Sequence, residues 1–218
     1  KNKENKNTII KSSASNENGL LERVEPKVNK ERLDKFYKYA LNVEGGYDKS
    51  LGEERKYGIT KEVARNYGYQ GSMKDLPVDL AKEIYTKKYY NKNRIGEIKD
   101  DKVAFSIFDW TLNSGKVAIK KLQQTLNEIN GNNDLAVDGI IGKHTLAAVN
   151  KANSEELLML YHGSENKFYD DIVKNDPSQE KFLTGWHNRL SKKEEFIKKE
   201  FEPAKPKSLS EAKKGVTR

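Results

Sequence analysis

The chain has 218 residues, of which 34% are charged and 35% are hydrophobic, so apolar burial has to be concentrated in part of its length. Its 41 basic and 33 acidic side chains give a net charge of +8, which suits an anionic polymer as partner. No apolar run approaches the length that spans a membrane, and the absence of cysteine excludes disulfide and thiolate chemistry. A soluble chain without stable membrane insertion is therefore expected.

In chain order, the pattern runs from a polar leader through a helical middle to a polar tail. Residues 1–30 are rich in Lys, Asn and Ser and are expected to form a flexible leader. Amphipathic periodicity then predicts an all-α fold, with helices over residues 31–44, 60–67, 77–90, 101–113, 116–130, 143–151, 154–174 and 179–200. The segment 47–57 is left open between a loop and a short β-ribbon. Two prolines end the last helix, and residues 201–218 are expected to form a flexible basic tail.

The first predicted helix ends with a carboxyl group on its apolar side. Glu44 continues the stripe of Leu33, Phe36 and Leu41, and the next two residues are glycines that supply a left-handed C-cap. Burial and the negative end of the helix dipole both disfavour the carboxylate anion. Glu44 is therefore a candidate general acid that holds a proton near neutral pH. For the residue taken alone, an ion pair with a nearby Lys or Arg is the more ordinary interpretation.

Several motifs follow one another in a fixed order over residues 31 to 195. They are Glu44-Gly45-Gly46-Tyr47, Tyr57-Gly58-Ile59-Thr60, the segment from Asp109 to Gly115, the Leu122-Gln123 helix, the Asp138-Gly139 turn and Gly185-Trp186-His187-Asn188-Arg189. Together they resemble the glycoside hydrolase family 108 muramidases, lysozyme-like enzymes found as phage endolysins and bacterial secretion-associated lysozymes, with their C-terminal predicted peptidoglycan-binding module. Each motif alone is weak, whereas their order argues against a chance match.

The resemblance implies both an architecture and an activity. A lysozyme-like catalytic domain is expected at residues 31–118 and a helical peptidoglycan-binding-like domain at residues 119–200. The implied enzyme is a glycoside hydrolase that cleaves peptidoglycan between N-acetylmuramic acid and N-acetylglucosamine, with Glu44 as catalytic acid and without a cofactor. Two alternatives stay open: a degenerate lysozyme fold that only binds cell-wall glycan, and a one-acid enzyme that cleaves as lytic transglycosylases do.

Hydrolysis of a glycosidic bond usually requires a second carboxylate, and here the chain departs from the family's pattern. The loop after the Glu-Gly-Gly-Tyr motif is shorter, acidic residues replace one of its glycines, and Arg55 stands where the family has a threonine. The candidates are Asp48, Glu53 and Glu54, of which Glu53 is preferred for its spacing from Glu44. Arg55 would bind an anionic substrate group or would pair with Glu44, and the pairing would argue against turnover.

Groove-lining residues are expected next to the matched motifs. Aromatic rings and an amide suited to glycan binding are Tyr47, Tyr57, Trp110 and Asn113. Tyr85 and Tyr89, one helical turn apart, are expected in the core. None of the three histidines has the spacing of metal ligands, so no metal site is expected.

Bacterial peptidoglycan is the expected partner, with anionic cell-envelope polymers as a second candidate. No zinc-finger spacing, RNP-type strand or recognition helix indicates nucleic acid. The chain is expected to act as a monomer in the cell envelope, either in the periplasm or after export. A phage-encoded lysin delivered to the cell wall fits the same pattern.

Overall fold

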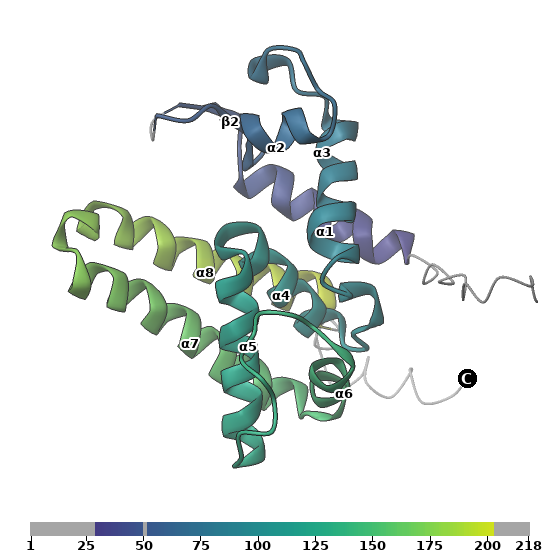
Figure 1. The fold of residues 1–218 in the computed structure, drawn as a ribbon, viewed down its shortest axis with the longest axis vertical. Helices are drawn as coiled ribbons and strands as arrows, with labels where there is room; N and C mark the ends of the chain where they lie inside the picture. Colours follow the sequence, from purple (N-terminus) through teal and green to yellow (C-terminus); the bar gives the residue numbers. More distant parts are fainter. Residues whose placement is uncertain (1–28, 50–51, 203–218) are drawn as a thin grey trace, which may run out of the picture.

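Residues 29–49 and 52–202 are described by the structure, a computed structural model of the chain. The predicted leader and tail lie almost wholly outside these ranges. Helices dominate the described part, as predicted (Figure 1). The α-helices are α1 Lys30–Val43, α2 Lys61–Asn66, α3 Val78–Ile84, α4 Asp101–Ser114, α5 Lys116–Asn130, α6 Lys143–Lys151, α7 Ser154–Asn175 and α8 Glu180–Phe201.

The helix predicted over residues 77–90 is divided in the structure. It begins as α3 and continues as the π-helical turn η2, Tyr85–Asn91. The other predicted helices begin and end within two residues of the observed bounds. Three short 3-10 turns complete the helical inventory of the described ranges: η1 Met73–Asp75, η3 Ile95–Glu97 and η4 Pro177–Gln179.

A small antiparallel sheet follows α1, so the ribbon interpretation of segment 47–57 is confirmed. Its strands are β1 Tyr47–Asp48, β2 Arg55–Lys56 and β3 Ile59–Thr60, in the order β1-β2-β3. The register places Asp48 opposite Arg55, and Arg55 opposite Thr60. Directly opposite side chains share a face of the sheet, so these three residues form one row across it.

The helix α4 is the centre of the fold. All residues from 103 to 111 of this helix are buried, which is the pattern of a helix covered on every side. It contacts α1, α5, α7 and α8, and α8 lies alongside it in Figure 1. The ring of Phe105 packs edge-on against Phe36 of α1 at 5.2 Å, and Trp110 packs against Tyr161 of α7 at 4.9 Å. Helices from both predicted domains thus share one core.

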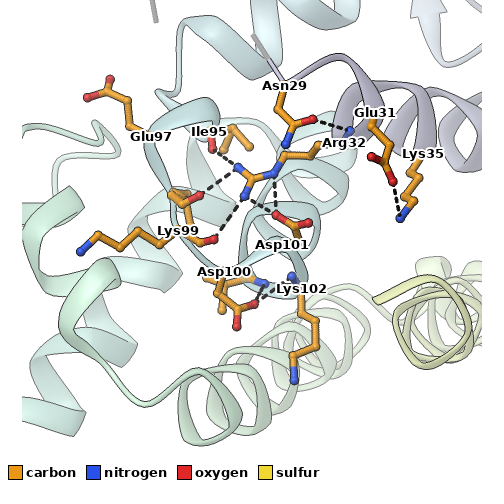
Figure 2. A network of polar contacts seen from close by, with 12 residues as sticks. Asn29, Glu31, Arg32, Lys35, Ile95, Glu97, Lys99, Asp100, Asp101 and Lys102 are labelled. Carbon is orange, nitrogen blue, oxygen red and sulfur yellow. Dashed lines mark hydrogen bonds and ion pairs between the residues drawn. The ribbon is translucent and has the colours of Figure 1, made fainter. Parts of the chain in front are cut away.

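A buried arginine fixes the start of α1 to the start of α4 (Figure 2). Arg32 is 7% exposed, and its guanidinium donates to the Asp101 carboxylate at 2.7 Å and to the carbonyl of Ile98 at 2.9 Å. The Asp101 side chain is 44% exposed, so only the arginine is buried, and its bonds to Asp101 and to the backbone before α4 join the starts of the two helices. No helix of residues 29–49 and 52–202 is long and apolar enough to cross a membrane.

Candidate active site

Glu44 lies at the end of α1, where the chain leaves the helix. Its backbone N–H still bonds to the carbonyl of Ala40 at 2.9 Å, and Gly45 follows with a φ of +68°. The left-handed glycine ends the helix as the sequence predicts. The Glu44 side chain, 17% exposed, opens onto a cavity of about 330 Å³ between the sheet, η2 and the end of α4. This volume is at the small end of the range typical of ligand pockets.

Gly58 makes room for the Glu44 carboxyl group. A Cβ atom at Gly58 would lie 2.6 Å from Glu44 Oε2 and 2.8 Å from its Cδ, and the φ of Gly58 is +68°. The positive φ favours glycine, and any side chain at position 58 would displace the Glu44 carboxyl group. The two motifs that flank the loop, Glu-Gly-Gly-Tyr and Tyr-Gly-Ile-Thr, meet at this contact.

Hydrogen bonds on both sides of Gly58 stabilise the turn that carries it. Tyr57 has a φ of +54°, an uncommon conformation for a bulky residue. Its carbonyl accepts a hydrogen bond of 2.6 Å from the hydroxyl of the buried Tyr85 in η2. After the turn, the Thr60 side chain accepts from the backbone N–H of Val63 and caps α2. These bonds fix the backbone next to the Glu44 carboxyl group.

The expected apolar surroundings of Glu44 are not what the structure shows. Arg189 of α8 places its Nη2 atom 2.7 Å from Glu44 Oε1 and 2.7 Å from Asp109 Oδ1. Burial alone would lower the pKa of Arg189, but the carboxylates of Asp109 and Glu44 raise it above its ordinary value. The ion pair considered between Glu44 and Arg55 is thus made instead by an arginine from the far end of the chain.

Asp48 is brought into the same cavity as Glu44. The row formed by Asp48, Arg55 and Thr60 across the sheet lines this cavity on the side of the ribbon. Directly opposite residues of a sheet have their Cβ atoms about 5 Å apart, so Arg55 lies between an acid and a hydroxyl. The structure therefore assembles an acid, a cation and a second acid around one cavity.

The other two candidate acids face a different hollow of the ribbon. Glu53 lies 3.5 Å from the Arg55 guanidinium. Glu54 accepts a bond from Lys61 at 2.8 Å and another from the Tyr47 hydroxyl at 2.8 Å, and these bonds hold its pKa below the usual range. Neither lines the cavity that contains Glu44, whereas Asp48 does.

Two protein families match consecutive parts of this chain. Residues 37–115 match the family described as Glycosyl hydrolase 108, and residues 117–191 match the Predicted Peptidoglycan domain. Residues 37–115 are a glycosyl hydrolase 108 domain. A similar solved structure is that of Brucella abortus SagA, with 25% sequence identity and a TM-score of 0.64, covering 77% of this chain and 95% of that chain. No match is found among curated proteins.

The predicted groove residues of the glycosyl hydrolase 108 domain fall into two groups. Asn113 lines the cavity and donates to the Tyr169 hydroxyl at 2.6 Å. Tyr47 and Tyr57 are half-buried on the ribbon, next to the cavity but not among the residues that line it. Trp110 has no exposed surface, and a buried ring offers no face to a sugar. Its expected place in the groove is therefore corrected to the core.

Residues not predicted for the site also line or reach the cavity. Tyr89, expected in the core, lines it, and burial followed by the charge of Glu44 raises the pKa of its hydroxyl to about 12. Lys88 lines it too, and burial lowers its pKa. Arg189 is the last residue of the Gly-Trp-x-x-Arg motif, a signal that could have drawn attention to it.

Within residues 29–49 and 52–202, no group of three or more His, Asp or Glu side chains could hold a metal ion.

Proposed function

We propose that the protein is an N-acetylmuramidase that hydrolyses peptidoglycan between N-acetylmuramic acid and N-acetylglucosamine. The observation that carries this proposal is the Glu44 carboxyl group, held between the Gly58 backbone and Arg189 at the edge of a cavity that Asp48 also lines. The glycosyl hydrolase 108 domain and the predicted peptidoglycan domain that follows it support the substrate class. The proposed division is a catalytic domain at residues 31–118 and a peptidoglycan-binding-like domain at residues 119–200.

The proposed chemistry uses two carboxyl groups. Glu44 protonates the leaving glycosidic oxygen as its bond to the anomeric carbon breaks. Water supplies the new oxygen on that carbon, and Asp48, on the ribbon side of the cavity, acts either as base for the water or as the nucleophile that the water later displaces. Arg55, in the same row as Asp48, would contact an anionic group of the substrate such as the lactyl carboxylate or the stem peptide. Asn113 would donate to an acetamido or hydroxyl oxygen of the glycan.

Two other outcomes compete with hydrolysis. The ion pair between Glu44 and Arg189 occupies the carboxyl group that would donate the proton, which is an argument for a protein that binds cell-wall glycan without turnover. Asp48 is the proposed second acid, because Glu53 does not line the cavity. Without help from Asp48, a one-acid transglycosylase route would remain. The product of the reaction separates the three.

Digestion of purified peptidoglycan, followed by borohydride reduction and mass spectrometry, tests the proposal. Products that end in reduced N-acetylmuramic acid are expected. Products that end in 1,6-anhydro-N-acetylmuramic acid would indicate the transglycosylase route. Glycan that is bound but not shortened would indicate the non-catalytic binder, and reduced N-acetylglucosamine ends would contradict the proposed bond.

The proposed partner is bacterial peptidoglycan, and the proposed place of action is the cell wall, where the chain works as a monomer. The predicted peptidoglycan domain supports both the partner and the place. A sedimentation assay with insoluble cell-wall sacculi measures this binding directly, and sedimentation velocity measures the oligomeric state.

A further inference from the structure

A cation of the C-terminal half reaches the carboxyl group of the glycosyl hydrolase 108 domain. Arg189 belongs to α8 and lies within the residues matched to the predicted peptidoglycan domain. Its side chain is 11% exposed, and its Nη2 atom contacts both Glu44 and Asp109 at 2.7 Å. The segments matched to the two families are therefore in contact at Glu44, the carboxyl group on which the proposed reaction depends.

Asp109 sets the direction of the arginine. Its carboxylate is fully buried in α4, with Oδ1 on Arg189 and Oδ2 at 3.4 Å from the ammonium of Lys193, also of α8. Lys193 in turn contacts the buried Glu165 of α7. A guanidinium held by a buried, doubly paired carboxylate has little freedom to turn away from its second partner.

The buried network around Arg189 holds more acids than cations. Three carboxyl groups, Glu44, Asp109 and Glu165, face two cations, Arg189 and Lys193. One negative charge is thus in excess when all five groups are ionised, and Arg189 is shared between two acids. Arg189 therefore contacts Asp109 and Glu44 at once, and Lys193 contacts Asp109 and Glu165. Burial raises the pKa of Glu165 above its ordinary value, against the opposing charge of Lys193.

We infer that Arg189 is a positioning residue for Glu44, so that α8 of the predicted peptidoglycan domain completes the active site of the glycosyl hydrolase 108 domain. The Glu44 carboxyl group is confined on one side by Gly58 and on another by Arg189. A catalytic group held from two sides keeps the direction that proton transfer requires. This inference rests on the proposed function, because it assigns a role in the same reaction.

A second ion pair between the same two helices offers a matched control. Lys38 of α1 lies 3.6 Å from Glu200 of α8 and is largely exposed. Lys38→Gln removes a contact between α1 and α8 without touching the cavity. If Arg189 only fastened α8 to α1, both changes would act through stability alone.

The experiment measures kcat and KM on soluble peptidoglycan fragments, with thermal melting, for the parent protein, Arg189→Gln, Arg189→Lys and Lys38→Gln. Arg189→Gln is expected to lower kcat by about 100-fold with KM nearly unchanged, as a misplaced catalytic group does. Arg189→Lys, which keeps the charge, should recover part of this loss, and Lys38→Gln should keep the parent kcat.

Two results would overturn the inference while leaving the proposed function intact: parent-like kcat in folded Arg189→Gln, or an equal loss in Lys38→Gln. Should Arg189→Gln fail to fold, a folded Arg189→Lys with parent-like kcat would overturn it too, because a flexible ammonium does not hold Glu44 and Asp109 in the fixed directions of a planar guanidinium. A parent protein with no activity on any fragment would instead refute the proposed function.

Discussion

The contact between Gly58 and Glu44 makes the substitution Gly58→Ala a sharp test of the site. The new methyl carbon would lie 2.6 Å from Glu44 Oε2, whereas carbon contacts are normally about 3.5 Å or longer. Relief therefore requires the carboxyl group or the turn to move by about 0.9 Å. A displacement of about 1 Å in a catalytic group costs on the order of 100-fold in rate.

The same substitution also strains the backbone. The φ of Gly58 is +68°, and a left-handed alanine costs roughly 1 to 2 kcal/mol. Gly68 separates this effect from the steric one, because its φ is +83° and a Cβ there would meet nothing within 4 Å. Gly68→Ala should lower the free energy of unfolding by about 1 kcal/mol and should leave activity unchanged.

The assay compares clearing of a cell-wall suspension by both variants with urea denaturation of each. Gly58→Ala should lose about 100-fold in initial rate while it stays folded at the assay temperature. If Gly58→Ala clears walls as fast as Gly68→Ala, the Glu44 carboxyl group is not confined by Gly58, and the geometry described for the site is refuted.

Two further predictions concern the second carboxylate and a buried histidine. Asp48→Asn should abolish wall clearing and Glu53→Gln should retain it, because only Asp48 lines the cavity with Glu44; the reverse pattern would restore the assignment based on spacing. Burial, and next the charge of Lys193, lowers the pKa of His162 from 6.5 to about 3. Between pH 6.5 and pH 3, His162 is therefore protonated in the unfolded chain and neutral in the folded chain. Stability should therefore fall as the pH drops from 6 to 4, by about 1 kcal/mol per pH unit. His162→Gln should remove this component of urea denaturation curves, and an unchanged pH dependence would contradict it.

The helices and the position of Glu44 could be predicted from the sequence because they depend on local signals. Apolar periodicity marks the buried face of each helix, and Gly45 marks the end of α1 through its positive φ. The stripe that includes Phe36 correctly indicates a Glu44 side chain turned towards the interior, at 17% exposure.

The partners of Glu44 could not be predicted, because they depend on how distant helices cross. Arg189 reaches the site only when α8 packs against α1 and α4, and no spacing rule connects two residues so far apart. Trp110 belongs to a helix that is covered on all sides, so its burial depends on α7 rather than on its own motif.

The choice between Asp48 and Glu53 depends on the register of strands that are only two residues long. A shift of one residue moves every side chain to the other face of a sheet. Strands this short carry too few alternating residues to fix that register in the sequence. Spacing from Glu44 therefore favours Glu53, whereas the observed pairing of Asp48 with Arg55 places Asp48 in the cavity.

The most direct test of the central claim is the rate at which Glu44→Gln digests purified peptidoglycan. The amide keeps the shape of the side chain and its oxygen can still accept a hydrogen bond from Arg189, but it cannot donate the proton as an acid, so the rate should fall by on the order of 100-fold or more. Sedimentation with sacculi and the melting temperature should remain close to those of the parent. A Glu44→Gln variant that releases the same products at the parent rate would show that Glu44 is not the catalytic acid.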